Sequence, residues 1–344
     1  MKTVRRETFS PANYVAFSMA TLVVFLVCVA LGSVNISPGL TLRVIWNAIS
    51  GQPQPDVTAV PIILSTRLPR VMCTALVGAS LSIGGGSMQG LLKNPLADGS
   101  TLGVSGGAGL GAVVALTFGI SIPGLPFAGT MVMAIVFAFL SLIIILSLAY
   151  RLDYTLSTNT IILLGIIYSM FASSIVALLT SFAGDRVRDI TFWLMGSLSG
   201  SSYANVAVLA VTALVCGGVL VACARELNAF AIGEDNARHI GVNVKRVRLL
   251  VLIVVAALIG VCVSVSGMIG FVGLVTPHMV RMIVGPNHRR LLPATLFGGA
   301  CFLMLADLAA RTLLSPREMP IGVITSLIGA ILFLTIFFRT RKGR

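Results

Sequence analysis

The sequence predicts an all-α, polytopic membrane protein with about ten transmembrane helices, and three observations predict it. Hydrophobic residues make up 57% of the 344 residues and charged residues only 10%, whereas soluble domains carry about 25% charged residues. Apolar runs close to the ~20 residues that cross a bilayer recur along the whole chain. The basic residues are distributed unevenly between the connecting segments. The composition excludes a soluble enzyme, a disordered chain and a nucleic-acid-binding domain, although the formal net charge is +13.

Ten apolar runs separated by polar breaks define the predicted spans. The first run follows a basic N-terminal segment and is too long for the core of a signal peptide, so we expect it to be retained. The eighth is the shortest and contains Pro277 and Arg281, which makes it the weakest of the ten. In chain order the runs are 14–34, 68–91, 100–120, 126–150, 158–182, 203–224, 246–266, 271–285, 291–313 and 321–339.

The basic residues orient the spans, because cytoplasmic segments of membrane proteins are enriched in Lys and Arg. With the N-terminus inside, 17 of the 24 Lys and Arg residues fall in cytoplasmic segments. The outer segments then hold the other seven, which are Arg43, Arg67, Arg70, Arg186, Arg188, Arg311 and Arg317. This distribution predicts an even number of spans, two cytoplasmic termini and a multi-pass protein of the inner, cytoplasmic membrane.

Two segments of the chain match each other at a constant offset of 182 residues. ALVGASLSIGGGSMQGLLKNP (75–95) and ALIGVCVSVSGMIGFVGLVTP (257–277) share 7 identities in 21 positions. Because the two predicted spans cross in opposite directions, the match indicates an inverted repeat, which is typical of transporters. The halves are roughly 60–190 and 245–340 within one transmembrane domain covering 1–344. Chance similarity between glycine-rich helices is the alternative.

Each copy of the repeat contains glycines at which we expect the helix to break. They are Gly84, Gly85 and Gly86 in the first copy and Gly267 and Gly270 in the second. A break at membrane depth is tolerated where protein or a water-filled cavity receives the freed backbone groups.

The sequence lacks the motifs of several kinds of active site. It contains no G-x-x-x-x-G-K-[ST] nucleotide loop, no H-E-x-x-H and no G-x-S-x-G. Its six cysteines lie in apolar runs without a C-x-x-C pair, so neither a metal site nor a disulfide framework is predicted. Asp307 and Arg311 are four residues apart on one helical face, as in a local ion pair. Transport driven by ATP would therefore require another polypeptide.

The longest cytoplasmic segment runs from residue 225 to 248 and predicts one or two short helices. Asp235 or Asn236 can cap such a helix, and Gly241 can end it in the left-handed conformation. A connector between two spans can be far shorter, so a folded polar segment here favours docking by a cytoplasmic protein. A solvated amphipathic surface element is the alternative.

On the outer side, RLPR (67–70) opens the second predicted span. Cations at a helix N-terminus oppose the helix dipole, so Arg67 and Arg70 are expected to need an anionic partner. Lipid phosphate, a local acid such as Asp56 or Glu318, and carboxylates of a partner protein are the candidates.

Together, motifs spread along the chain resemble the FecCD/BtuC family, the permeases of ABC importers for iron-siderophores, haem and cobalamin. The resemblance runs from about residue 20 to the end of the chain. One departure is Gly99-Ser100, where the family often has proline-glycine. The motifs are RLPR (67–70), GASLSIGGGSMQGLLKNPLADGSTLGVSGGAG (78–109), WLMGSLSG (193–200), GEDNARHIGV (233–242), SGMIGFVGLVTPHMVRMIVGPNHRRLLP (266–293), ADLAAR (306–311) and EMPIGVITSLIGAILF (318–333).

The resemblance implies a ten-span permease that pairs with a second copy or a paralogue, with the pathway at the dimer axis. It implies two cytoplasmic ABC ATPase subunits, which use the ATP, and an extracytoplasmic substrate-binding protein. It also implies residue roles. Arg67, Arg70 and Arg311 would dock the binding protein, Ser157, Thr158 and Asn159 would narrow an inner gate, and the ATPase would couple through the segment 225–245, at Gly233, Glu234, Asp235, Asn236, Ala237 and Gly241.

The function predicted from these observations is a non-catalytic permease subunit that gives a metal chelate a path across the membrane. Ferric siderophore is favoured as the commonest cargo in the family, while haem, cobalamin and oxyanions such as molybdate stay open. A stand-alone, ion-coupled secondary carrier is the first alternative, although carriers of that class keep carboxylates at mid-membrane. A membrane enzyme is the second alternative, and it would need paired titratable groups at depth.

Overall fold

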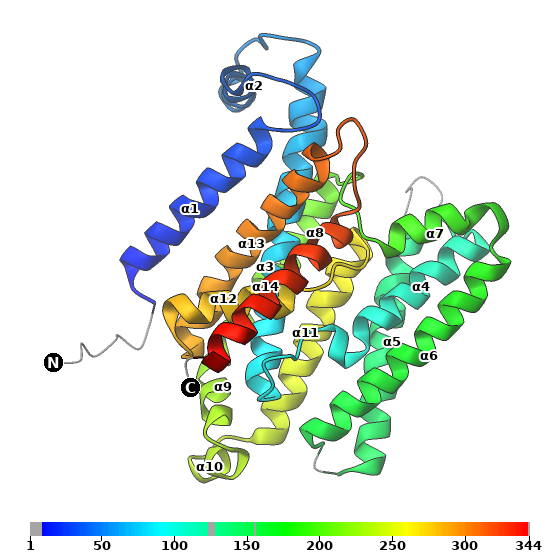
Figure 1. Cartoon of the computed structure of the whole chain (residues 1–344), viewed down its shortest axis with the longest axis vertical. Coiled ribbons are helices and arrows are strands. Elements are labelled where there is room, and N and C mark those ends of the chain that lie inside the picture. Colours follow the sequence, from blue (N-terminus) through cyan, green and yellow to red (C-terminus); the bar gives the residue numbers. More distant parts are fainter. Residues whose placement is uncertain (1–8, 123–127, 155, 343–344) are drawn as a thin grey trace.

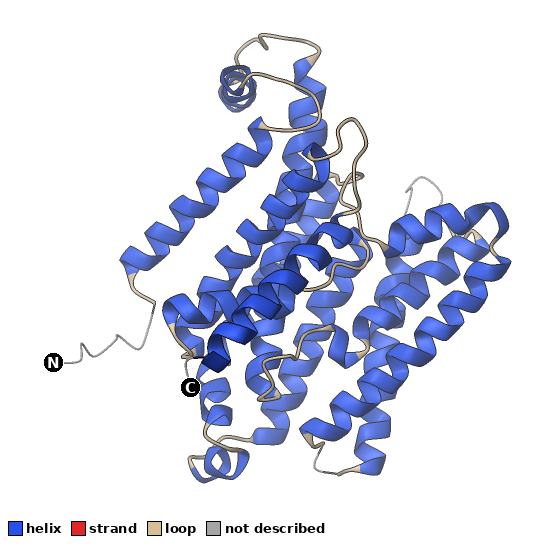
Figure 2. Ribbon diagram, in the orientation of Figure 1, coloured by secondary structure: helices blue, strands red, loops and turns tan. Residues whose placement is uncertain are grey.

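The protein is a bundle of helices, here in a computed structural model that describes residues 9–122, 128–154 and 156–342. Figure 2 shows helices joined by loops, with no β-strand in those ranges. Within them, seven helices are long and apolar enough to cross a membrane, and three further apolar helices are shorter. The all-α, polytopic prediction is confirmed. The basic residues Lys2, Arg5, Arg6 and Arg344, which were used to orient the spans, lie outside the described residues.

Each of the ten predicted spans corresponds to one helix. The agreement follows from the bilayer, since its thickness sets the length of an apolar run and hence its visibility in the sequence. The helices are α1 (Pro11–Ala30), α3 (Leu68–Leu91), α4 (Val104–Phe118), α5 (Ala128–Leu152), α6 (Thr158–Phe182), α8 (Tyr203–Ala222), α11 (Val244–Ser266), α12 (Val272–Val284), α13 (His288–Thr312) and α14 (Ile321–Lys342).

Four short helices lie at the two ends of the bundle (Figure 1). One end carries α2 (Pro38–Ser50) and α7 (Val187–Leu194), and we refer to it as the α2 end. The opposite end carries α9 (Ala224–Ala231) and α10 (Glu234–His239), and we refer to it as the α10 end. The last two confirm the prediction of one or two short helices between residues 225 and 248.

The helix of the second span begins earlier than the sequence predicts. A π-helical stretch, Pro61–Arg67, runs directly into α3, so that the continuous helix covers the 31 residues Pro61–Leu91. The π-helical turn precedes Pro69, which has no N–H to give to the regular pattern. Arg67 and Arg70 therefore do not stand at a free helix N-terminus, and the expected conflict with the helix dipole does not arise.

The predicted break at Gly84–Gly86 is wrong, because α3 is continuous through these residues. A Cβ atom at Gly85 would lie 1.9 Å from the carbonyl oxygen of Gly273 in α12. Gly85 thus permits a close approach of two helix backbones, as small residues do in membrane proteins. In the second copy the helix does end: Gly267 caps α11 with φ +67°, and Phe271 caps α12 with φ +67°.

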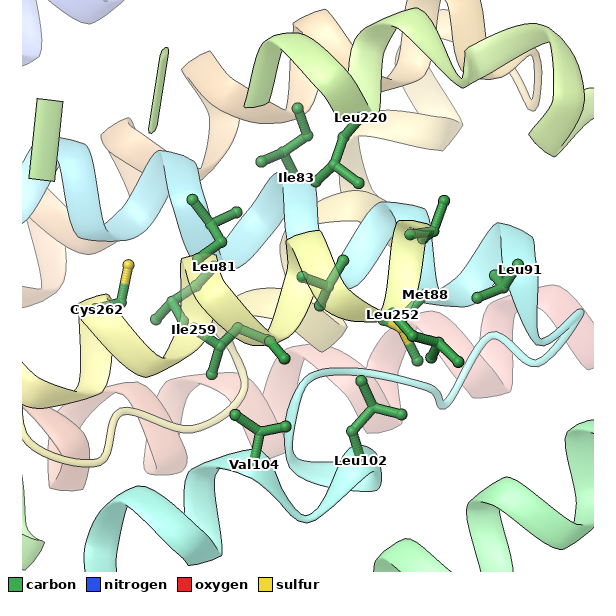
Figure 3. Packing of buried hydrophobic residues seen from close by; sticks show 14 of the residues in the cluster. Leu81, Ile83, Met88, Leu91, Leu102, Val104, Leu220, Leu252, Ile259 and Cys262 are labelled. Atoms are coloured by element: carbon green, nitrogen blue, oxygen red, sulfur yellow. The ribbon is translucent and has the colours of Figure 1, made fainter. Parts of the chain in front are cut away.

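The core lies along α3 and α11 (Figure 3). Leu81, Ile83 and Met88 of α3 are buried with Leu252 and Ile259 of α11. Because lipid tails are as apolar as these side chains, the stability of such a core within a bilayer comes from close packing rather than from removing apolar surface from water.

The two helices that carry the matching segments cross the bundle in opposite directions (Figure 1). α3 starts at the α2 end, and α11 starts at the α10 end. An inverted repeat requires this arrangement, while the boundaries of the two halves stay a prediction.

Candidate functional site

The three arginines expected to dock a binding protein lie together at the α2 end and are buried. The exposed fraction is 5% for Arg67, 6% for Arg70 and 3% for Arg311. We refer to these three residues as the arginine cluster. The ends of α3 and α13 bring them together, since these two helices pack against each other along their length.

Two acids neutralise Arg70. Its Nε and Nη2 atoms donate to Oδ1 of Asp307 over 3.1 and 2.9 Å, and its Nη1 atom donates to Oε2 of Glu318 over 2.8 Å. Oδ2 of Asp307 also lies 3.0 Å from Nε of Arg311, which confirms the ion pair predicted from their spacing. The Asp307 side chain is 1% exposed, so one buried carboxylate serves two guanidinium groups.

The other two arginines cap the C-terminus of α1. Arg67 donates to the carbonyl oxygens of Val29 and Ala30, over 3.3 and 3.0 Å, and to that of Val34. Arg311 donates to the carbonyl oxygen of Cys28 over 3.1 Å. The last carbonyls of a helix have no intrahelical partner and carry partial negative charge, so cations there are favourable.

Arg70 and Arg311 therefore have acidic partners within the chain, whereas Arg67 donates to backbone carbonyl oxygens. Of the two local acids named from the sequence, Glu318 is a partner of Arg70 and Asp56 is not. The Asp56 carboxylate instead accepts from the backbone N–H and the hydroxyl of Thr58, over 2.8 and 2.7 Å, and the hydroxyl contact is the largest cause that lowers the pKa of Asp56.

At the α10 end, the residues expected to couple to an ATPase form a short helix with a defined stop. The N–H of Val242 donates to Ala237 and that of Gly241 donates to Arg238, over 3.0 Å each, with Gly241 at φ +89°. This pattern is a Schellman motif and confirms the left-handed Gly241 predicted from the sequence.

The predicted cap of α10 is wrong. The helix begins at Glu234 with Gly233 (φ +115°) before it and no side-chain cap. Asn236 instead donates from Nδ2 to the carbonyl oxygen of Ile232 over 2.7 Å. Ala237 is fully buried, whereas Asp235 and Asn236 are exposed, so α10 has one face anchored to the protein and one face open.

The preceding helix, α9, is fixed to the start of α13 by an amide network. Oδ1 of Asn228 accepts from the backbone N–H of His288 over 2.8 Å and lies 2.9 Å from Nδ1 of its ring. Nδ2 of Asn228 donates to Oδ1 of Asn287 over 2.8 Å. The α9–α10 segment is thus held against the transmembrane bundle rather than hanging from it.

The residues expected at an inner gate lie at the same end, where α6 begins (Figure 1). Ser157 is the N-cap of α6, and its hydroxyl accepts from the backbone N–H of Thr160. Its own N–H donates to Oδ2 of Asp153 over 3.0 Å. Thr158 is partly buried and Asn159 is exposed.

Two cavities lie in the bundle between these ends. One of about 710 Å³ is lined by residues of α4, α6 and α7 such as Gly109, Ser173 and Thr180, and none of its lining residues is charged. A second, of about 400 Å³, lies between the loop that holds Asp98 and the break around Gly270.

A comparison of the sequence with known protein families finds a match along almost the whole chain. The model of the FecCD transport family covers residues 20–339. The chain belongs to the FecCD transport family. The resemblance seen in the sequence motifs is therefore confirmed, and this FecCD-family protein is a multi-pass protein of the inner membrane.

Curated relatives of this FecCD-family protein are permease proteins. It is 37% identical over 329 residues to the hemin transport system permease HmuU of Yersinia pestis, covering 94% of this chain and 96% of that one. It is 39% identical over 307 residues to the cobalamin import system permease BtuC of Halobacterium salinarum, covering 89% and 80%. A solved inward-facing conformation of a metal-chelate type ABC transporter aligns with a TM-score of 0.84 and 31% identity, covering 96% of this chain and all of that one.

Sequence reasoning missed two contacts that complete these sites. Asp307 carries a clear local signal, its spacing from Arg311, but nothing local shows that it also binds Arg70, 237 residues away. Arg248 stands in the basic run KRVR, and only the structure shows that it is 1% exposed and bonded to Glu234.

Proposed function

We propose that the protein is the permease subunit of an ATP-driven importer that moves a metal chelate across the inner membrane. Ferric siderophore is the favoured cargo, and haem, cobalamin and molybdate are the other candidates. The names of its relatives span these four kinds of cargo: hemin, cobalamin, molybdate and iron(3+)-hydroxamate. The small, uncharged walls of the larger cavity support a pathway that leaves selection to a separate binding protein.

The observation that carries the proposal is the α9–α10 segment, which is firmly anchored on one side and exposed on the other. A pair of cytoplasmic ATPase subunits would dock there, at Gly233, Glu234, Asp235, Asn236 and Gly241, while the buried Ala237 would hold the coupling helix against the bundle. An anchored helix can pass a displacement to the transmembrane helices, and the movement of packed helices against each other is a common route of gating. Ser157, Thr158 and Asn159 would form the inner gate that responds.

A substrate-binding protein would dock at the α2 end, and the arginine cluster limits how it can do so. Each guanidinium group already has partners in the chain, so a carboxylate from outside would compete with them. Glu318 is the most accessible partner, since its side chain is 34% exposed against 1% for Asp307. We therefore propose that exchange at Arg70, between Glu318 and a carboxylate of the binding protein, is the docking contact of this cluster.

The permease would act as a dimer, either with itself or with a paralogue. Much of α6 is exposed, including large apolar side chains such as Ile166, Met170 and Phe171. A second permease copy could cover this face and enclose the pathway, while lipid would cover the remaining apolar surface.

The alternative function is a stand-alone secondary carrier driven by an ion gradient. The contacts of the buried acid Asp307 do not favour it, because Asp307 is paired with two arginines at the α2 end rather than poised at mid-membrane. The two functions differ in one requirement, since only the importer needs a nucleotide-hydrolysing partner.

The experiment that tests the proposed cargo is identification of what the partner binding protein captures. The purified binding protein should bind one of a ferric hydroxamate, hemin, cobalamin or molybdate, measured by tryptophan fluorescence, and should bind this permease in detergent. Capture of a free amino acid or sugar in place of these compounds would contradict the metal-chelate proposal.

A further inference from the structure

One buried arginine connects three segments at the α10 end. Arg248 belongs to the first turns of α11, and its side chain is 1% exposed. Its Nη2 atom donates to Oε1 of Glu234, the first residue of α10. Its Nη1 atom donates over 2.5 Å to the carbonyl oxygen of Leu156, in the loop between α5 and α6.

The two ends of this connection lie where movement would matter. Glu234 follows Gly233, whose φ of +115° marks a sharp change of chain direction before α10. Leu156 is 2% exposed, has a left-handed φ of +54° and directly precedes Ser157, the N-cap of α6. One guanidinium group thus joins the exposed helix to the residue directly before the predicted gate.

The helix that carries the arginine is the fixed part of this arrangement. α11 packs against α3, α4, α5 and α8, and its buried face includes Val251, Leu252 and Val255. The planar guanidinium group holds its two partners in fixed directions. Removing a partner from a buried charge is costly, so a displacement of α10 tends to carry the Arg248 side chain with it rather than break the bond.

We propose that Arg248 is a positioning residue that transmits movement of α10 to the α5–α6 loop and the N-terminus of α6. This inference rests on the proposed function, because it assumes that a partner protein moves α10. It adds a route from docking site to gate that runs through one side chain and one backbone carbonyl.

The experiment uses the permease co-purified with its ATPase subunit and measures hydrogen exchange of the segment 153–160, with and without ATP and vanadate. Glu234→Gln weakens the bond to α10 while leaving the contact with Leu156 in place. Arg248→Lys keeps the charge but has no planar fork to reach both partners. Arg246→Gln is the matched control, since Arg246 is exposed and two residues away on the same helix.

In the unmodified complex, nucleotide should change exchange of this segment by about tenfold, a shift of the size seen for local opening. Arg248→Lys should reduce that change to about twofold or less while ATP hydrolysis continues, because coupled pairs lose energies of this order. Glu234 also belongs to the proposed docking segment, so Glu234→Gln is compared only in complexes that retain their ATPase on co-purification, and there it should show the same reduction. A purely structural role would alter exchange equally with and without nucleotide. Arg246→Gln should respond as the unmodified complex does.

Two results would overturn the inference, and they are distinguishable. A nucleotide response that persists unchanged in Glu234→Gln and Arg248→Lys removes the role of Arg248 and leaves the proposed function standing. Failure of the unmodified permease to bind an ATPase, or to respond to nucleotide at all, removes both.

Discussion

The two ends of the bundle present different polar surfaces to a partner protein. At the α2 end, the arginine cluster is at most 6% exposed, and its charges are matched by two acids and by the carbonyl oxygens at the end of α1. At the α10 end, Asp235 and Asn236 face outward from a short helix whose other face is anchored by buried Ala237.

This difference indicates that the arginine cluster holds helices together, whereas the α10 end is a contact surface. The arginine cluster and its acids fasten α1, α3 and α13 to each other and leave few unpaired groups within the cluster for a partner. The α10 end presents exposed polar side chains on a helix that is anchored to the bundle. This arrangement is expected where a partner protein moves the permease. In an importer driven by cytoplasmic ATPases, the moving surface belongs at the α10 end.

The largest effect should come from removing the carboxylate of Asp307, which Arg70 and Arg311 share. Asp307→Asn leaves the buried Arg70 and Arg311 without their common carboxylate, and breaking a buried pair in this way costs about 3–5 kcal/mol. Thermal unfolding in detergent should show a clear loss of stability. Glu318→Gln is the control, because its partly exposed side chain should contribute about 1 kcal/mol or less. Equal stability of the two variants would mean that Asp307 does not stabilise the protein through its two arginines.

A smaller effect should come from the helix contact between the two ends. A Cβ atom at Gly85 would lie 1.9 Å from a backbone oxygen, whereas one at Gly84 would have no atom nearer than 3.7 Å. Gly85→Ala should therefore destabilise the protein by about 1–3 kcal/mol, as overpacking does. The neighbouring Gly84→Ala should be neutral or slightly stabilising, because alanine favours helix. Matching unfolding temperatures for the two variants would mean that α3 and α12 are not closely packed.

The open face of α10 should matter for assembly and not for stability. Replacing Asp235 and Asn236 together by alanine should lower the amount of co-purified ATPase by about tenfold, a typical loss for a few central interface residues. Arg317→Gln, which changes an exposed cation at the α2 end, should leave co-purification unchanged. An undiminished yield of ATPase in the double variant would mean that the coupling surface lies elsewhere.

The smallest effect should be a gain in the affinity of the arginine cluster for the binding protein. If a carboxylate of the binding protein competes with Glu318 for Arg70, Glu318→Gln should tighten docking by about threefold, since an electrostatic competitor has been removed. Surface plasmon resonance with immobilised permease would measure it. Unchanged or weaker docking would contradict the proposed exchange at Arg70.

The ten spans could be predicted because each is a local property of the chain. An apolar run of sufficient length is a helix in a membrane whatever its neighbours are. The stop at Gly241 is local too, since the left-handed conformation favours glycine. α2 also had a signal that was not used: Ser37 and Pro38 form an N-cap and first turn, and Gly51 ends the helix with φ +70°.

The tertiary partners could not be predicted from local patterns. Arg67 and Arg70 look like exposed cations at a helix start, and only the folded chain brings Asp307 and the end of α1 to them. Gly85 looks like a helix break, and it is instead the place where Gly273 approaches. In both cases the deciding atoms lie far away in the sequence, and one sequence carries no record of such contacts.

Reconstitution into liposomes tests the central claim most directly. The permease, its ATPase and its binding protein would be reconstituted together, and the permease would also be reconstituted alone, with uptake of a radiolabelled ferric hydroxamate, hemin and cobalamin measured in each. The complete system should accumulate one of these compounds against its gradient only when ATP reaches the ATPase, and the permease alone should accumulate none under a proton or sodium gradient. Accumulation by the lone chain would contradict the account.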